Sequence, residues 1–349
     1  MPRQSVYIYI LMCLFLLPGW VVAAPDGEQL FLQHCSACHG SAGNGGVGVP
    51  LALPAFQNSV DDQFLIKTVQ LGRPGRVMPG FPFLKEQEVQ AIVKHIRSWV
   101  DGKPPVFDKT RIKGDVKRGK QLYGKHCAAC HGANGEGGHG TGVTFSRPRD
   151  LPIIAPSLNN SGFLTAASDQ LIRKTLLEGR KGTPMLSAAE RGLTEQDVND
   201  VVAFVRSFDG KGMHDHIDLA SEPLSMEYES PFDFDKTVEK VKQAVIGMNF
   251  RIIREQWLEE GLVEKGKENP KQLMVYFCNF ELLNDALAVD PRVGLFLPCR
   301  VTIIEEKGKV KLVAVNPKRL SGLFNNNELD ILCEGMYDTY TEIMEEATL

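Results

Sequence analysis

Two pentapeptides of the form C-x-x-C-H constrain this chain more than any other feature of its sequence. They are residues 35–39 and 127–131. The two cysteines of such a peptide lie about one helical turn apart, where their thiols can add to two vinyl groups of a porphyrin, and the adjoining histidine can then bind the iron. The pattern therefore predicts two covalently bound haem c groups. The predicted attachment residues are Cys35, Cys38, Cys127 and Cys130, and the predicted proximal ligands are His39 and His131.

Both pentapeptides lie within a longer internal repeat. Residues 27–35 read GEQLFLQHC, and residues 119–127 read GKQLYGKHC. Each copy closes with apolar residues at the i, i+3, i+4, i+7 spacing of an amphipathic helix, over residues 89–99 and 198–208. A capping box is predicted at Thr194 and Asp197. We predict two small helical domains, residues 25–105 and 111–212, with a Gly/Pro-rich linker closing the first.

A methionine occurs at the same point of each copy, after a Gly-Arg pair and beside a proline. The two are Met78 and Met185. A methionine near a helix is often only a flexible core residue. Its repeated position instead favours a distal iron ligand, because Met and His together are established axial ligands of haem c. His139, in a glycine-rich segment, is the rival ligand for the second iron.

The same glycine-rich segments also match a nucleotide-binding pattern. Residues 43–48 and 135–140 both satisfy G-x-G-x-x-G. A dinucleotide site needs this turn between a β-strand and a helix, with a parallel sheet behind it. Here each turn directly follows a haem peptide in a helical region. We therefore interpret these glycines as positions where the backbone passes close to the porphyrin.

The first 24 residues have the parts of a secretory signal. Arg3 precedes an apolar run over residues 6–17, and residues 22–24 offer a small-residue cleavage site. We predict cleavage near Pro25 and a periplasmic protein without a membrane span. An uncleaved anchor is the alternative, because residues 6–24 are just long enough to cross a bilayer.

From residue 225 the pattern changes to that of an α+β domain, residues 225–349. Strands are predicted over residues 224–229, 250–255, 273–277, 295–305 and 310–315, and helices over residues 237–248 and 328–346. This part holds Cys278, Cys299 and Cys333. Buried thiols or one disulfide are expected for the two cysteines in predicted strands. A reactive Cys299 that handles a sulfur compound or binds a ligand is the alternative.

Residues 25–212 resemble two tandem class I cytochrome c domains, on the strength of the haem peptides, the methionine loops and the closing helices. The resemblance implies mostly α domains around one haem each, with a proximal histidine and usually a distal methionine. The stretch Leu297–Val301 resembles the domain-of-unknown-function family 302, which implies an α+β fold and no known activity.

Charge is spread unevenly over the chain. Residues 111–212 hold 15 Lys and Arg against 10 Asp and Glu, whereas residues 213–349 hold 15 against 25. This contrast predicts docking between these two parts, or steering of a charged redox partner. No basic cluster indicates a nucleic-acid partner.

We predict a dihaem protein that carries single electrons between a donor and an acceptor protein, and an electron-transfer protein in preference to an enzyme. Two alternatives stay open. One is a dihaem oxidoreductase, such as a peroxidase or a sulfur-compound oxidase. The other is a redox-linked sensor whose C-terminal domain binds a small ligand.

Overall fold

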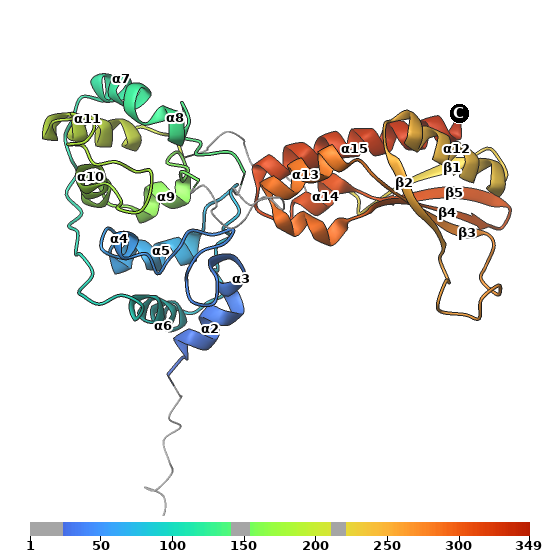
Figure 1. Ribbon diagram of the computed structural model, residues 1–349, viewed down its shortest axis with the longest axis horizontal. Helices are drawn as coiled ribbons and strands as arrows, with labels where there is room; N and C mark the ends of the chain where they lie inside the picture. Colours follow the sequence, from blue (N-terminus) through green and yellow to red (C-terminus); the bar gives the residue numbers. More distant parts are fainter. Residues whose placement is uncertain (1–23, 141–153, 211–220) are drawn as a thin grey trace, which may run out of the picture.

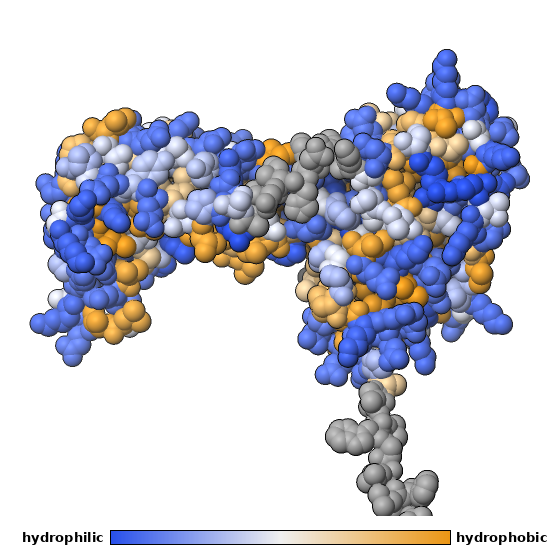
Figure 2. Space-filling view, turned by 180° about the vertical axis from the view of Figure 1, so that it is seen from behind, coloured by the Kyte–Doolittle hydropathy of each residue, from blue (hydrophilic) through white to orange (hydrophobic). Residues whose placement is uncertain are grey.

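The computed structural model describes residues 24–140, 154–210 and 221–349, so the predicted secretory signal and part of the loop after the second haem peptide lie outside the described residues. Figure 1 shows a helical part beside a C-terminal part built from a sheet and helices. The predicted order, mostly α followed by α+β, is confirmed. In the space-filling view the two parts form separate lobes, each with scattered apolar patches among polar residues (Figure 2). Within the described ranges, no helix has the length and apolar character needed to cross a membrane.

The two copies of the repeat fold into the same order of helices. In the first repeat, residues 25–105, these are α2 (Gly27–His34), α3 (Ser36–His39), α4 (Pro54–Gln57), α5 (Asp62–Leu71) and α6 (Glu86–Arg97). In the second repeat, residues 111–212, they are α7 (Val116–His126), α8 (Ala128–His131), α9 (Ser161–Ala166), α10 (Asp169–Glu178) and α11 (Glu195–Arg206). The predicted capping box at the start of α11 is confirmed, since Thr194 and Asp197 exchange side-chain to backbone hydrogen bonds.

A glycine brings the first and last helices of each repeat into close contact. A Cβ atom on Gly27 of α2 would lie 2.1 Å from the carbonyl oxygen of Ala91 in α6. In the second repeat, a Cβ atom on Gly119 of α7 would lie 2.0 Å from the carbonyl oxygen of Asp200 in α11. Only glycine permits such an approach. Because α2 and α7 run directly into the haem peptides, these crossings fix where the peptides lie.

The two repeats share one hydrophobic core. Its buried residues come from both copies, among them Phe31, Ile92, Tyr123 and Val202. Helices α5 and α9 meet across the boundary, where the rings of Phe64 and Phe163 pack edge to face with centroids 6.5 Å apart. The helical part is therefore one packed body, held by apolar burial as well as by the linker.

The C-terminal part is a five-stranded antiparallel sheet with the strand order β1-β5-β4-β3-β2. The strands are β1 (Ser225–Ser230), β2 (Arg251–Trp257), β3 (Gln272–Cys278), β4 (Cys299–Glu306) and β5 (Lys309–Val315). The long helix α15 (Asn327–Thr348) and helix α12 (Phe234–Gly247) pack against it, and their apolar faces cover buried strand residues such as Phe277 and Ile303.

Two helical segments lie between β3 and β4. They are α13 (Phe280–Val289) and the 3₁₀ helix η2 (Pro291–Phe296). The sequence prediction of a strand beginning at Leu295 is therefore wrong for its first residues, because Pro291 starts a helical turn there. The short helix α14 (Pro317–Ser321) connects β5 to the loop before α15. A small second core joins α13, η2 and the start of α15, with Val293, Phe324 and Leu329 buried in it.

Candidate haem sites

Each C-x-x-C-H peptide forms a short helical turn directly after a longer helix. The backbone N–H of Cys35 donates to the carbonyl of Phe31 at the end of α2, and the N–H of His39 donates to the carbonyl of Cys35 at 3.0 Å. In the second repeat, Cys127 and His131 make the same two hydrogen bonds, to Tyr123 and to Cys127. The pairs of thiols and the imidazoles therefore project from equivalent turns in the two repeats.

Both histidines are oriented by a backbone carbonyl from the loop that follows. His39 Nδ1 lies 2.9 Å from the carbonyl oxygen of Val49, and His131 Nδ1 lies 2.9 Å from that of Pro156. A carbonyl can only accept, so Nδ1 carries the proton and Nε2 keeps its lone pair for a metal. Burial lowers the pKa of both imidazoles, which favours the neutral form that binds iron.

A glycine lets the loop close over the first imidazole. A Cβ atom on Gly48 would lie 2.6 Å from Cε1 of His39. Gly48 is the last glycine of the first G-x-G-x-x-G match. The only sheet in the described residues is antiparallel and lies in the C-terminal part, so neither match has the strand and parallel sheet of a dinucleotide site.

The two methionine loops have the same backbone turn. In the first, the N–H of Arg73 donates to the carbonyl of Met78 at 2.9 Å. In the second, the N–H of Arg180 donates to the carbonyl of Met185 at 2.8 Å. Both methionines are half-buried. The structure thus gives the two predicted distal ligands equivalent positions in the two repeats.

The arginines of these loops are half-buried, and each stacks on an aromatic ring of the other repeat. Arg73 lies over Phe163 with its guanidinium carbon 5.9 Å from the ring centroid, and Arg180 lies over Phe56 at 5.4 Å. Burial lowers the pKa of both guanidinium groups to about 10, so both stay charged at neutral pH. In the sequence, the repeated Gly-Arg pair marks the position of each methionine, but it predicts no role for the arginines themselves.

The second repeat has buried donors that suit the carboxylates of a haem. Arg180 Nε and Thr175 Oγ1 are buried without a hydrogen-bond partner among the described residues. Buried polar groups are rarely left unpaired in proteins, and a haem propionate is an acceptor of the kind these donors need. Together with the thiols and the oriented imidazoles, this donor set fits haem c.

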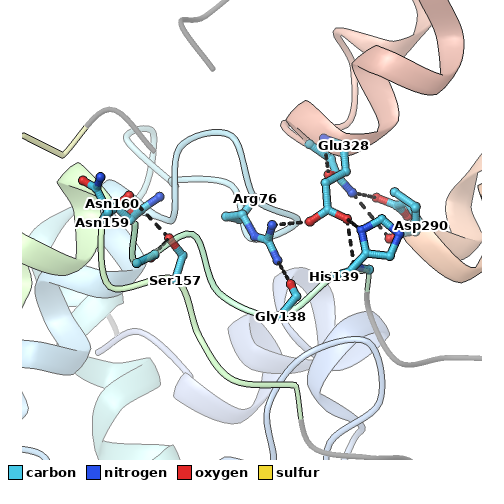
Figure 3. Close-up of polar contacts among 12 residues, drawn as sticks. Arg76, Gly138, His139, Ser157, Asn159, Asn160, Asp290 and Glu328 are labelled. Atoms are coloured by element: carbon cyan, nitrogen blue, oxygen red, sulfur yellow. Dashed lines mark hydrogen bonds and ion pairs between the residues drawn. The ribbon is translucent and has the colours of Figure 1, made fainter. Parts of the chain in front are cut away.

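His139, the rival ligand for the second iron, contacts the C-terminal part of the chain in this structure. Its Nδ1 is 2.8 Å from Oε2 of Glu328, a residue of α15, and its side chain is exposed. Figure 3 shows His139 and Arg76 on either side of the Glu328 carboxylate. Arg76 also donates to the carbonyl of Gly138 at 2.7 Å, so both repeats and the C-terminal part meet at this point.

The three remaining described cysteines are unbridged thiols. Cys278 and Cys333 are buried, and Cys299 is half-buried. Burial raises the pKa of Cys299 to about 11, although a hydrogen bond with the Tyr340 hydroxyl opposes this shift. A thiol with so high a pKa is a poor nucleophile at neutral pH. These features favour the interpretation of Cys299 as a structural residue.

Three sequence families match consecutive parts of the chain. Residues 22–96 match the cbb3-type cytochrome c oxidase subunit III family, residues 116–209 match the cytochrome c family, and residues 226–347 match the domain of unknown function DUF302. Cytochrome c55X of Stutzerimonas stutzeri is 39% identical over 88 residues, which span 77% of that protein and 23% of this chain. This chain belongs to the cytochrome c family. Its cytochrome c domains imply covalently bound haem c.

Longer alignments relate this cytochrome to oxidase subunits. The cbb3-type cytochrome c oxidase subunit CcoP of Azospirillum sp. (strain B510) is 26% identical over 202 residues, covering 54% of this chain and 63% of the relative. The chain thus spans less than two thirds of the length of such relatives. Among solved structures, a DUF302 protein from Bacillus stearothermophilus aligns with 20% identity and a TM-score of 0.34, covering 36% of this chain and 98% of that protein.

Proposed function

We propose that this chain is an exported dihaem cytochrome c that carries single electrons between redox proteins. The observation that carries the proposal is the equivalence of the two repeats. In each, two thiols and one imidazole project from the same turn, and the imidazole Nδ1 is 2.9 Å from a loop carbonyl. Cys35, Cys38, Cys127 and Cys130 attach the two haems, His39 and His131 are the proximal ligands, and Met78 and Met185 are the distal ligands.

Haem c supplies a one-electron iron couple, and the chain's own residues adjust and protect it. The carbonyls of Val49 and Pro156 hold each imidazole neutral with Nε2 available for the iron. Methionine as the sixth ligand favours a high reduction potential compared with a second histidine. The buried guanidinium of each Gly-Arg pair adds positive charge, which also favours the reduced state.

The contact between the repeats supports electron transfer within the protein. Arg73 and Arg180 reach across the boundary in opposite directions, each onto an aromatic ring of the other repeat. The shared core holds the two repeats in one fixed arrangement. A rigid arrangement of two redox centres lets one accept an electron while the other delivers it, which suits a protein that connects a donor with an acceptor.

The relatives indicate the class of partner. Several matching proteins are named as subunits of cbb3-type oxidases, and one as a cytochrome bc1 complex cytochrome c subunit from Mycobacterium leprae. We infer that the donor and acceptor belong to a respiratory chain on the outer side of the cytoplasmic membrane. The high pKa of Cys299 disfavours the alternative of thiol-based sulfur chemistry.

Haem counting in variant proteins tests the proposal. The purified protein is expected to carry two haems per chain, measured by intact mass and by the pyridine haemochrome spectrum. The double substitution of Cys35 and Cys38 by Ala is expected to remove one haem, and that of Cys127 and Cys130 the other. A wild-type protein with one haem per chain would refute the dihaem assignment. Rapid binding of carbon monoxide to one haem of the wild type would instead support an enzyme with an open coordination position.

A further inference from the structure

One asparagine of the C-terminal part occupies the centre of the first methionine loop, residues 72–80. Asn325 Nδ2 lies 3.2 Å from the carbonyl oxygen of Arg73, 2.6 Å from that of Arg76 and 3.1 Å from that of Met78. Its Oδ1 accepts from the N–H of Gly75 at 3.2 Å. The two N–H bonds of this amide are thus shared among three loop carbonyls. One of those carbonyls belongs to Met78 itself.

The neighbours of Asn325 add further contacts between the same two segments. We call residues 323–328 the clamp loop. The N–H of Asn327 donates to the carbonyl of Gly75 at 2.9 Å, and Glu328 forms an ion pair with Arg76. Gly75 has a φ of +72°, and a Cβ atom there would lie 2.6 Å from the Asn327 side chain. The Asn327 side chain therefore packs against this turn at a position where only glycine leaves room for it.

The clamp loop is itself held firmly by the C-terminal part. Phe324 is buried in the small core with Leu329, and Asn326 is 3% exposed and caps α15 through the N–H of Glu328. Asn325 has a φ of +50°, a left-handed conformation that asparagine tolerates better than most residues. This backbone aims its amide into the methionine loop. Helix α15 then continues from the clamp loop onto the sheet, where Tyr340, Ile343 and Met344 are buried in the core.

The second methionine loop, residues 179–187, holds its turn with its own residues. Thr183 Oγ1 donates to the carbonyl of Arg180 at 2.8 Å, and the N–H of Met185 donates to the same hydroxyl at 3.2 Å. In the first repeat, the position of Thr183 is occupied by Arg76, which cannot make these bonds because its side chain extends to Glu328 and Gly138. The two loops share a turn, but only the first depends on an amide supplied by a different domain.

We propose that Asn325 is a positioning residue for Met78, through which the C-terminal domain controls the distal ligation of the first haem. This role depends on Met78 being an iron ligand, as proposed above. With the clamp loop in place, the carbonyls of the turn are paired and Met78 is held at its position. Without the Asn325 amide, the turn keeps its own hydrogen bonds, from the Arg73 N–H to Met78 and from the Arg76 N–H to Arg73, but loses those that Asn325 adds, and the Met78 side chain can leave the iron. The second haem keeps its ligand in both states.

Substitution of Asn325 in the full-length holoprotein tests this role. Asn325→Gly removes the amide and keeps the left-handed backbone, whereas Asn325→Asp keeps the shape and places a carboxylate against three carbonyl oxygens. Asn249 in the same domain has a φ of 62°, so Asn249→Gly is the matched control. Two measurements apply to each protein. One is carbon monoxide binding to the ferrous protein, and the other is the pair of ring-current-shifted methyl resonances given by iron-bound methionines.

Both Asn325 variants are expected to bind more carbon monoxide at one haem, with the methionine-free fraction raised about five- to thirtyfold, since each net hydrogen bond lost changes a population about fivefold. The methyl resonance that disappears in Met78→Ala should be the one that weakens in the Asn325 variants. Asn249→Gly should give the same carbon monoxide binding and the same resonances as the wild type. Wild-type carbon monoxide binding and resonances in both Asn325 variants would overturn the clamp. Retention of both resonances in Met78→Ala would instead overturn the ligand assignment, so the two failures are distinguishable.

Discussion

The close crossing of α7 and α11 makes a quantitative prediction for Gly119. In Gly119→Ala, the new methyl carbon would lie 2.0 Å from the Asp200 carbonyl oxygen and 2.9 Å from Cβ of Phe204. Since carbon–oxygen contacts under about 3 Å are repulsive, the helices must separate by roughly 1 Å. Gly124 lies five residues later in the same helix, and a Cβ atom there would meet nothing within 4 Å. Gly124→Ala is therefore the matched control.

The two substitutions should shift stability in opposite directions. Gly124→Ala should stabilise the helix by about 0.5–1 kcal/mol, because alanine loses less backbone entropy than glycine. Gly119→Ala has the same intrinsic gain, so the difference between the variants isolates the steric clash, which costs about 1–3 kcal/mol. For a packed body of this size, each kcal/mol corresponds to about 2–4 °C in Tm.

Thermal unfolding of the holoprotein, followed by Soret circular dichroism, measures this difference. Because α7 runs directly into the second haem peptide, the Soret signal reports on the element that the substitution moves. Gly119→Ala is expected to melt at a lower temperature than wild type, and Gly124→Ala at the same or a higher temperature. Equal melting temperatures for the two variants would refute the close-crossing explanation for glycine at position 119.

Three further predictions concern single side chains. Arg180→Met should lower the reduction potential of the second haem, because a buried positive charge favours the reduced state; an unchanged potential in a spectroelectrochemical titration would contradict this. Burial acts to raise the pKa of Asp200, but hydrogen bonds from the Asp115 N–H, Gln196 and Arg118 outweigh it and lower the pKa overall. Because the pKa is lower in the folded state, the ionised carboxylate stabilises the fold at pH values above the unfolded pKa of about 3.9. This stabilisation is lost as the pH falls through the folded-state pKa. The stability advantage of wild type over Asp200→Asn should therefore shrink below about pH 4 in urea titrations, and a pH-independent difference would count against it. Alkylation of Cys299 should be slow at neutral pH and accelerate toward its pKa of about 11, and fast labelling of the native protein at pH 7 would disprove the raised pKa.

The repeat made most of the helical part predictable from sequence. Equivalent spacing identified the haem peptides and closing helices, and the Thr194–Asp197 capping box is present as predicted. Period-2 patterning located the strands of the C-terminal sheet to within a few residues. These features depend on residues close together in the chain, where local geometry determines the pattern. The Leu295 region was mispredicted because apolar residues of a short 3₁₀ helix resemble a buried strand.

Contacts between distant segments could not be predicted in this way. The charge contrast predicted docking of the second repeat against the C-terminal part, or steering of a charged redox partner. His139 of the second repeat does contact Glu328 of the C-terminal part. The arginine that pairs with Glu328 is Arg76, however, and it comes from the first repeat. Asn325 lies in a run of three asparagines that reads as an ordinary turn. Its partners are about 250 residues earlier in the chain, and no local pattern records such a pairing.

One difference between the two repeats lies where the C-terminal part touches them. Both repeats keep the haem peptide, the oriented imidazole and the arginine of the methionine loop. One of the differences between the two methionine loops is Thr183 in the second repeat against Arg76 in the first. The Thr183 hydroxyl adds two hydrogen bonds to its own loop, whereas Arg76 extends to Glu328 and the carbonyls of its loop accept from Asn325. A domain that served only to solubilise the cytochrome would have no reason to bind that loop. The contact is instead what we expect if the C-terminal domain positions the proposed distal ligand of the first haem.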